Sequence, residues 1–453
     1  MDPFIFSGTD IAIGIIYLII VMGIVFSIRN KHKDNPAYKY FAPNFFFKLF
    51  FGLFFGFTFM VILGYGGDTL AYYQSATKLH NLFLDSPSKF FNELFSTPDR
   101  TSMSNNFSSS TGYPPGWIYY EPESFFVAKI YSLFSLITFK SYVGITVLSV
   151  FFASLASFKL FLMVYNYKFA SERVLAIATM FIPTVAFWCT GMSKDTIILG
   201  SFFFLLYHLF AYFDSSRKFT TKNLIAILFF GFIIYNIRPF MISAMAPPLL
   251  FGLSIGYINS MKSQLFKVLT KFVFFVVSFT VIGLVLAGSE LMLDQAEDAL
   301  AEVAVVQQDF AANQTYGGPR YDLGIEDFSP AGMIRSAPKA ILVTLYRPFL
   351  NEASGPLLFM SGIENTLFLI LTLGFLFRRG NIGQHLNFIT NHEFLSFCLF
   401  FILFFGFFVG FTAGLFNVLV RFKAPVLAFF VLLLVARDPE KTKKKVVEEK
   451  EGF

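Results

Sequence analysis

Runs of roughly 17–25 apolar residues recur along this chain, and this is the length that an α-helix needs to cross the hydrocarbon core of a bilayer. Inside a bilayer every backbone N–H and C=O must be hydrogen-bonded within the protein, so such runs fold as helices. The pattern predicts about eleven transmembrane helices. They are expected near residues 10–28, 44–64, 143–165, 173–190, 196–213, 224–239, 241–259, 272–288, 357–377, 394–415 and 418–436.

The composition agrees with an all-α, polytopic integral membrane helix bundle. Of the 453 residues, 55% are hydrophobic and only 14% are charged, whereas soluble proteins carry about 25% charged residues. Cys189 and Cys398 both fall within apolar runs, so no disulfide framework is expected.

Lysine and arginine are concentrated in one set of loops, which the positive-inside rule places in the cytoplasm. Alternation across the membrane then predicts an N-terminus outside and a C-terminus in the cytoplasm. We expect one transmembrane domain, residues 1–436, and a charged cytoplasmic tail, 437–453. The Phe- and Lys-rich composition without an obvious targeting signal suits a bacterial inner membrane. The basic segments are 29–39, 166–173, 215–222, 262–271, Arg378 with Arg379, and the tail.

The two long segments 65–142 and 289–356 are both predicted to lie outside, with juxtamembrane helices at the outer face. The first is expected to form an amphipathic helix to about Leu94. Its stretch 124–139 is too short for a regular span and is interpreted as an interfacial or re-entrant helix. The second segment is expected to hold an acidic helix, 290–309, and a Gly-rich turn.

Several charged residues stand at or inside the ends of apolar runs, and the expected topology places all of them on the outer side. Ionisable groups at membrane depth are costly unless they are paired or face a wet cavity, so they are candidates for function. One acid with several cations on one face suggests a site for an anionic headgroup. These residues are Asp68, Lys194, Asp195, Arg238, Arg347 and Arg421.

Asp68 follows two glycines just beyond a span, where the backbone can turn sharply. An alternative is that Asp68 only caps the next helix. Tyr72, one helical turn later, fits either interpretation.

Gly191 permits a break between two apolar runs, and Ser193 or Asp195 can cap the helix that follows. Lys194 is therefore expected at a helix N-terminus, where the helix dipole does not favour a cation. This favours an anion-binding role, and the alternative is that Lys194 extends to a lipid phosphate.

Arg238 and Arg347 each precede Pro-Phe, and a guanidinium presents a planar fork to phosphate oxygens. A single arginine at a membrane boundary is usually a snorkelling anchor. Arg238, Arg347 and Arg421 on one side favour a shared site instead, whereas Lys423 is expected to snorkel. Weaker candidates are Arg320 in the second outer loop and the acids Glu352 and Glu364.

The motifs of several enzyme classes are missing from the sequence. No phosphate-cradling Gly-rich loop, no zinc-spaced His/Cys cluster and no hydrolase nucleophile elbow occurs. No cofactor is therefore expected, although a divalent metal is left open, and no nucleic-acid partner is expected.

Three short stretches are similar to bacterial lipid-linked polysaccharide polymerases: GlyGlyAspThrLeuAlaTyrTyr (66–73), GlyMetSerLysAsp (191–195) and ArgPheLysAlaPro (421–425). The acid at the start of the first outer loop, with arginines on later outer helix ends, resembles the GT-C class of polytopic glycosyltransferases. The resemblance implies that Asp68 acts as base or positions the acceptor. It implies that Lys194, Arg238, Arg347 and Arg421 hold a polyprenyl phosphate. The chain departs from the class by placing its acid after the second span.

The expected function is transfer or polymerisation of sugar from a polyprenyl-phosphate or pyrophosphate carrier at the outer face of the membrane. The partners would be the lipid-linked donor, a glycan or other hydroxyl acceptor, and membrane lipid. The alternative is a transporter or flippase for a lipid-linked or anionic substrate, which would use the same cations without a base.

Overall fold

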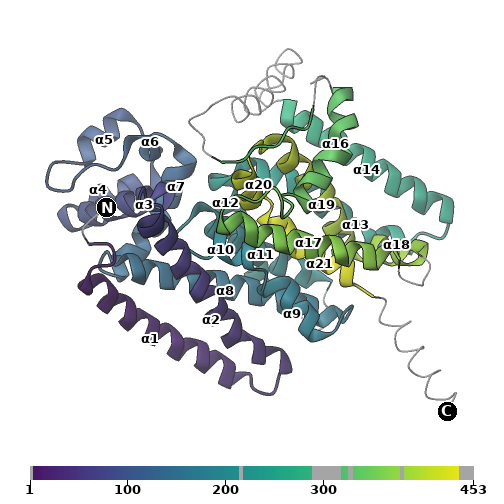
Figure 1. Cartoon of the computed structure of the whole chain (residues 1–453), viewed down its shortest axis with the longest axis horizontal. Helices are drawn as coiled ribbons and strands as arrows, with labels where there is room; N and C mark the ends of the chain where they lie inside the picture. The colour runs from purple at the N-terminus through teal and green to yellow at the C-terminus, as the bar shows by residue number, and fades with distance from the viewer. Residues whose placement is uncertain (1–3, 214–217, 288–317, 325–329, 378–381, 438–453) are drawn as a thin grey trace. The chain divides into compact units, whose positions relative to one another are not determined.

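Figure 1 shows the computed structural model of the chain, which describes residues 4–213, 218–287, 318–324, 330–377 and 382–437. Within these ranges the regular structure is helical and contains no β-strand, only one isolated bridge between Arg320 and Leu415. The prediction of an all-α protein is confirmed.

The chain divides into two compact units, which are treated one at a time. Unit 1 comprises Met1–Met163 and Val185–Pro239, and unit 2 comprises Val164–Thr184 and Phe240–Phe453. A single transmembrane domain over 1–436 stays a prediction. The expected helix at 290–309, the pair Arg378 and Arg379, and nearly all of the tail lie outside the described residues.

Unit 1 contains the N-terminal helices and the first long inter-span segment. Its elements are α1 (Gly8–Lys31), η1 (Pro36–Tyr40), α2 (Phe41–Phe57), η2 (Thr58–Ile62), α3 (Gly67–Asp85), α4 (Pro87–Phe95), α5 (Arg100–Asn106), α6 (Gly116–Tyr119), α7 (Pro122–Ile137), most of α8 (Tyr142–Tyr167), most of α10 (Pro183–Trp188), α11 (Lys194–Leu209), η3 (Phe210–Tyr212) and α12 (Thr221–Ile237).

Unit 2 holds most of the C-terminal half. Its elements are the end of α8, α9 (Glu172–Met180), α13 (Pro239–Ser260), α14 (Gln264–Ala287), α16 (Pro330–Tyr346), α17 (Pro356–Leu376), α18 (Ile382–Asn391), α19 (Glu393–Thr412), α20 (Phe416–Phe422) and α21 (Ala424–Val435).

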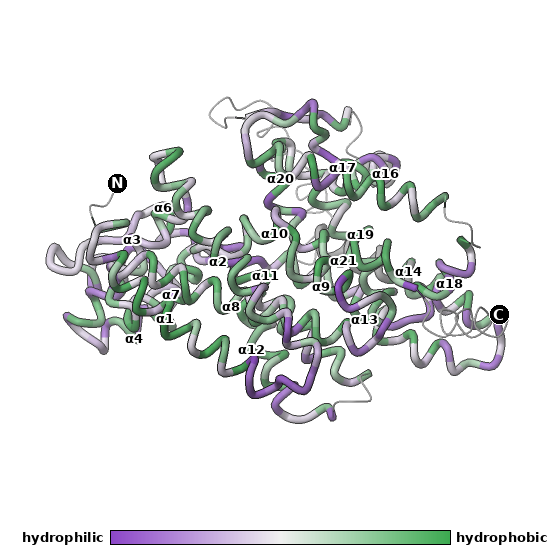
Figure 2. The backbone as a smooth tube through the Cα atoms, turned by 60° about the horizontal axis from the view of Figure 1, so that its bottom comes forward, coloured by the Kyte–Doolittle hydropathy of each residue, from purple (hydrophilic) through white to green (hydrophobic). Residues whose placement is uncertain are grey.

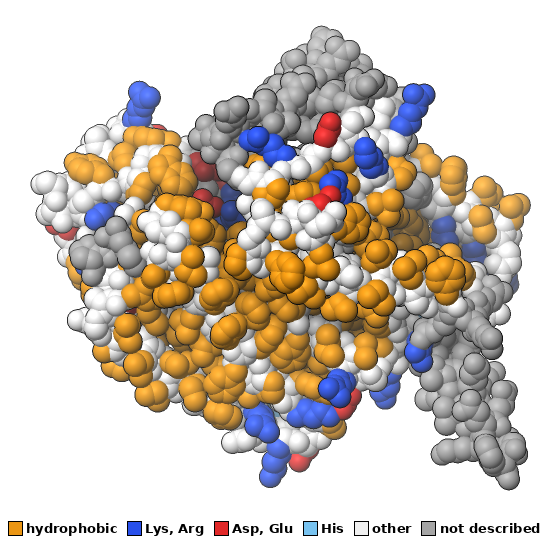
Figure 3. Space-filling view, viewed as in Figure 1, with side chains coloured by type: hydrophobic (Ala, Val, Ile, Leu, Met, Phe, Trp, Pro, Cys, Tyr) orange, Lys and Arg blue, Asp and Glu red, His pale blue; other side chains and the backbone are white. Residues whose placement is uncertain are grey.

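By length and composition, the described residues include 7 helices able to cross a membrane, or up to 8 if the pair α20–α21, bent by 63°, counts as one span. These helices indicate an integral membrane protein. The hydrophobic tube colour of the long helices (Figure 2) and the hydrophobic side chains over much of the face in view (Figure 3) agree with this assignment.

The expected count of about eleven spans is not confirmed. The run 173–190 forms two short helices, α9 and α10, because Pro183 cannot donate a backbone hydrogen bond and disfavours a helical residue before it. The run 224–239 forms α12, which is shorter than the other candidates. The run 272–288 falls on α14, where most side chains lie outside the described residues.

The part of the first long inter-span segment expected as one amphipathic helix folds as two helices, α3 and α4. The helix expected to continue to Leu94 ends at Asp85, because Ser86 caps a new helix whose first residue is Pro87. The expected helix at 124–139 is present as α7, and α7 packs along α3. The placement of α7 at the membrane surface stays a prediction.

A buried carboxylate joins α1 to the start of α8. Asp10 is fully buried, and its Oδ1 accepts hydrogen bonds from Ser141 Oγ (2.6 Å) and Val143 N (3.1 Å). Its Oδ2 accepts one from Phe6 N (2.8 Å). One side chain therefore satisfies backbone donors at the ends of two helices far apart in sequence.

Replacing Asp10 with alanine is expected to lower the free energy of unfolding by roughly 2–4 kcal/mol, because buried N–H groups lose their acceptor. Denaturant titration of the protein in detergent micelles measures the change. Asp34→Ala, at an exposed position before η1, is the matched control and is expected to change stability by less than about 0.5 kcal/mol. Equal stability of the two variants would contradict the anchoring role.

Candidate functional site

The predicted site residues fall into two groups, one in each unit. Unit 1 holds Asp68, Tyr72, Lys194, Asp195 and Arg238, and unit 2 holds Arg320, Arg347, Glu352, Glu364 and Arg421. Each group is described by itself. A pocket shared by all of these residues stays a prediction.

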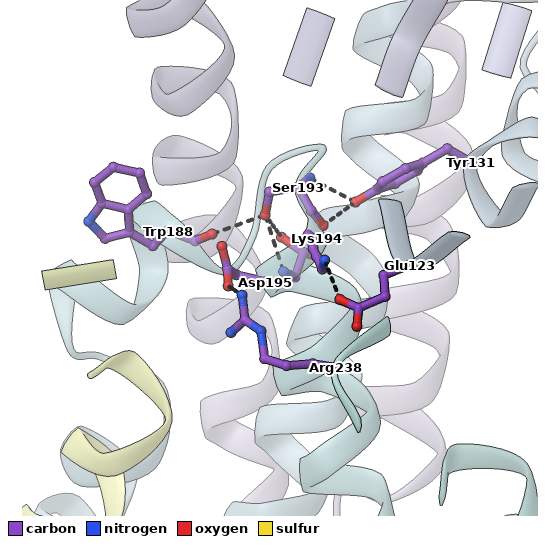
Figure 4. A network of polar contacts seen from close by, with 8 residues as sticks. Glu123, Tyr131, Trp188, Ser193, Lys194, Asp195 and Arg238 are labelled. Carbon is purple, nitrogen blue, oxygen red and sulfur yellow. Dashed lines mark hydrogen bonds and ion pairs between the residues drawn. The ribbon is translucent and has the colours of Figure 1, made fainter. Parts of the chain in front are cut away.

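A tight break between α10 and α11 positions Lys194 and Asp195 (Figure 4). Gly191 is required there, because a Cβ on it would lie 2.4 Å from the ring of Phe55. Ser193 caps α11 by accepting a hydrogen bond from Thr196 N (3.1 Å), and its Oγ donates to the carbonyl of Trp188 (3.1 Å). The break expected at Gly191 is confirmed, and of the two expected caps, Ser193 or Asp195, it is Ser193 that caps α11.

Asp195 forms a buried ion pair with Arg238. The distance from Arg238 Nη2 to Asp195 Oδ1 is 3.1 Å, and the two side chains are only 7% and 6% exposed. Arg238 is the C-cap of α12, directly before Pro239. Arg238 was predicted as a phosphate ligand, and in the structure Asp195 already neutralises its charge.

Lys194 forms a second ion pair, with Glu123 in the first turn of α7 (Figure 4). The distance from Nζ to Oε2 is 3.1 Å, and the side chains of Lys194 and Glu123 are 11% and 43% exposed. An anion at a helix N-terminus is favoured by the dipole, so Glu123 offsets the unfavourable position of Lys194. The sequence did not single out Glu123. The only feature of the sequence that indicates Glu123 is its position just before an apolar run.

Tyr131, on α7, holds the break in place. Its hydroxyl donates to the carbonyl of Ser193 and accepts from the N–H of Ser193, both at 2.8 Å. The ring of Tyr72 lies 6.5 Å from the ring of Tyr131, centroid to centroid. Tyr72, predicted from its place one turn after Asp68, therefore connects α3 to the Lys194 segment through Tyr131.

Asp68 lies in the first turn of α3, half-buried, after Gly66 and Gly67. Both glycines have positive φ (73° and 53°), a conformation that side chains with Cβ rarely adopt. Gly66 occupies the N-cap position of α3, so Asp68 is not the capping residue. Partial burial and, second, the charge of the Asp68 carboxylate raise the pKa of Tyr65.

Aromatic contacts also join the segment before α3 to the end of α10. Phe59 contacts both Tyr65 and Trp188, with centroids 6.2 Å apart in each case. Two sets of packed rings therefore lie between the segments that carry Asp68 and Lys194. One set is Tyr65, Phe59 and Trp188, and the other is Tyr72 and Tyr131. With Glu123 included, the unit 1 group contains more carboxylates than cations, whereas one acid with several cations was expected.

In unit 2 the guanidinium of Arg347 lies between a carboxylate and two rings. Nε donates to both carboxylate oxygens of Glu352 (2.9 and 3.0 Å), and Nη2 also donates to Oε1. The guanidinium carbon lies 5.6 Å from the ring of Tyr321 and 5.0 Å from that of Phe416. Arg347 and Glu352, predicted as separate candidates, are direct partners.

The segment 318–324 lies across the break between α19 and α20. Tyr321 N donates to Gly414 O (3.0 Å), the Tyr321 hydroxyl donates to Gly410 O (2.9 Å), and Phe416 N donates to Pro319 O (3.1 Å). Arg320 is exposed on this segment. Arg421 is half-buried on α20, three residues before the helix α21 begins.

Lys423 does not snorkel, and that prediction is wrong. The residue is fully buried at the 63° bend between α20 and α21. Its Nζ donates to the carbonyl of Arg347 (2.9 Å) and to Asn365 Oδ1 (2.7 Å), and Asn365 Nδ2 donates to Pro348 O (2.8 Å).

Glu364 is also buried, with 7% exposure, and its Oε1 accepts a hydrogen bond from Thr184 N (2.7 Å). Among the described residues no group of three or more His, Cys, Asp or Glu side chains is arranged to hold a metal ion.

The Arg347–Glu352 pair predicts a pH dependence of stability. Burial raises the pKa of Glu352. Hydrogen bonds from Arg347 and Phe349 N, together with the charge of Arg347, lower that pKa by more, so it lies below the ordinary value of 4.5. A carboxyl with a lowered folded pKa stabilises the fold above its unfolded pKa, and this contribution is lost as pH falls through the folded value.

Glu352→Gln is therefore expected to lose less thermal stability than the unmodified protein when the pH falls from about 6 to about 3. Melting temperatures in detergent across this range measure the difference. Glu121→Gln, at an exposed position before α7, is the control and is expected to follow the unmodified protein. Parallel curves for all three proteins would contradict the prediction.

Comparison of the chain with protein-family models, with curated proteins and with solved structures found no match.

Proposed function

We propose that the chain is a membrane enzyme that transfers a sugar, or a sugar chain, from a polyprenyl-phosphate or pyrophosphate carrier to a hydroxyl acceptor. The observation that carries the proposal is the arrangement in unit 1. Asp68 lies half-buried directly after a helix of membrane-spanning length, and packed aromatic residues connect it to the Lys194–Glu123 pair. The GT-C-like motifs of the sequence support the same activity.

In this proposal Asp68 is the general base. The acceptor hydroxyl oxygen bonds to the anomeric carbon of the donor sugar while the bond from that carbon to the carrier phosphate breaks. The hydroxyl proton moves to the Asp68 carboxylate, and the electron pair of the broken bond stays on the phosphate. Such proton transfer contributes about 10²–10⁴-fold to a rate.

Lys194 is the proposed partner of the carrier phosphate. Its present partner, Glu123, is 43% exposed and reaches it through a single contact. A phosphate with more negative charge can replace that carboxylate at the same helix N-terminus. Fixed cations stabilise charge that develops on the leaving group, and such electrostatic stabilisation usually accelerates a reaction of this kind more than any other effect.

Arg347 offers related chemistry in unit 2. Glu352 uses the Nε and Nη2 edge of the guanidinium, and the side chain of Arg347 is 24% exposed. A guanidinium has five N–H donors in a fixed fork, so its other edge suits a phosphate oxygen. We place the reaction at the outer face of a bacterial inner membrane, with the N-terminus outside, as the distribution of basic loops predicts.

The test uses purified protein in lipid nanodiscs with a radiolabelled polyprenyl-pyrophosphate oligosaccharide. An enzyme converts it to free polyprenyl pyrophosphate and a longer or transferred glycan, which thin-layer chromatography separates. A transporter or flippase moves the lipid between leaflets without changing any covalent bond. An unchanged donor together with accelerated transbilayer movement would contradict the proposal and favour the transporter.

A further inference from the structure

The short helix α6 is held rigidly on one side. Ile118 and Tyr119 are fully buried, and the Tyr119 hydroxyl donates to Glu93 Oε1 (2.8 Å) and lies 2.6 Å from Ser102 Oγ. The Tyr119 ring also packs on Phe125, with centroids 4.6 Å apart. These contacts fix α6 against α7 and the neighbouring helices of unit 1.

The other side of α6 exposes large aromatic rings. Trp117 is 59% exposed and Tyr120 is 47% exposed, and residues three apart on a helix share a face. Tyr113, just before the helix, is 53% exposed. A Cβ added to Gly116 would lie 3.6 Å from the Tyr120 ring, so that ring lies along the helix. We call Tyr113, Trp117 and Tyr120 the aromatic platform.

The aromatic platform lies close in sequence to the candidate site. Glu121 is exposed, and Glu123, only three residues after Tyr120, is the partner of Lys194. The other exposed hydrophobic residues nearby, Leu84, Phe91 and Phe95, carry no polar atom and suit lipid. Tyr and Trp combine an apolar ring with a polar tip, the combination that fits the C–H face and hydroxyl edge of a sugar.

We propose that the aromatic platform binds the glycan, with sugar rings stacked on Trp117 and Tyr120, and directs it toward the Lys194–Glu123 pair. This inference rests on the proposed function, because it identifies where the saccharide substrate of that site binds.

Tryptophan fluorescence can report on Trp117 alone, because the chain contains only 2 tryptophans and the other can be replaced. Trp188 is buried, at 8% exposure, and Trp188→Phe leaves Trp117 as the one tryptophan, which is excited selectively at wavelengths where tyrosine does not absorb. Full-length protein in nanodiscs is titrated with maltohexaose and with chitohexaose. Saturable quenching or a blue shift of Trp117, with protection from acrylamide, is expected for at least one saccharide. No change with either saccharide overturns the proposal.

Substitutions then test whether the saccharide binds at the aromatic platform. Trp117→Ala and Tyr120→Ala are each expected to weaken binding of the radiolabelled saccharide at least about tenfold, as loss of a central aromatic contact does. Phe95→Ala, at an even more exposed ring of the same region, is the matched control and is expected to bind normally. Equal affinity in all three variants would overturn the proposal.

A second measurement tests whether the membrane covers the platform instead. Lipids brominated near the headgroup quench tryptophan at the membrane interface. Strong quenching of Trp117 by these lipids, without any effect of saccharide, assigns the platform to the bilayer and overturns glycan binding.

The outcomes also separate this inference from the proposed function. Saccharide binding through Trp117 without any sugar transfer leaves the platform standing and removes the enzyme. Sugar transfer with an unchanged acceptor KM in Trp117→Ala leaves the enzyme standing and removes the platform.

Discussion

Asp68→Asn is expected to reduce the rate of sugar transfer by about 10²–10⁴-fold, the usual contribution of a general base. Asparagine has the shape of aspartate but cannot accept the acceptor proton at neutral pH. Because the turn before α3 depends on Gly66 and Gly67, which the substitution leaves intact, the variant is expected to fold normally.

The rate of release of polyprenyl pyrophosphate in nanodiscs measures the effect, and the KM of the donor is expected to stay within a few-fold of the original. Asp85→Asn is the matched control, because Asp85 is exposed at the opposite end of the same helix. Its rate is expected to equal that of the unmodified protein. Full activity of Asp68→Asn would remove Asp68 from the mechanism.

The buried pair Asp195–Arg238 gives the second large effect. Arg238→Met alone, or Asp195→Asn alone, removes this ion pair and leaves the charge of the other residue buried. Breaking a buried pair in this way costs about 3–5 kcal/mol. The double variant Asp195→Asn with Arg238→Met removes both charges and is expected to recover most of that stability, because no buried charge is left without its counter-charge.

Denaturant titrations in detergent for the two single variants and the double variant form a complete cycle. Glu121→Gln, at an exposed position before α7, is the control and is expected to change stability by less than about 0.5 kcal/mol. Additive losses in the double variant would show that the two side chains do not depend on each other.

The same cycle separates a structural role of Arg238 from a role in catalysis. If Arg238 binds the carrier phosphate, the double variant regains stability but keeps a donor KM at least about tenfold above the original, the loss of one good contact. If the double variant regains both stability and activity, Arg238 only supports the fold.

Hydropathy located the membrane-length helices well. The runs expected at 10–28, 143–165 and 394–415 are present as α1, α8 and α19, with ends shifted by a few residues. Length and apolar content are local properties, so no knowledge of packing is needed to recognise them. The break at Gly191 and Ser193 was predictable for the same reason, because glycine and a serine cap act within one turn.

The charged side chains show where such local reasoning ends. Lys194, Arg238 and Arg347 were recognised as unusual from their positions alone, but they were expected to bind a phosphate. In the structure Lys194 pairs with Glu123 from another helix, and Arg238 pairs with Asp195 across the α11–α12 packing. A buried cation requires a counter-charge, yet nothing local indicates which acid supplies it.

Helical membrane-length segments, and the residues too costly to bury alone, follow from the order of amino acids because burial energy and backbone hydrogen bonding act over short stretches. The pairing of each cation, the burial of Lys423 at a helix bend, and the exposure of Trp117 beside a buried Tyr119 follow from packing between distant helices. Such contacts depend on where helices meet in space, and that information is spread over the whole chain.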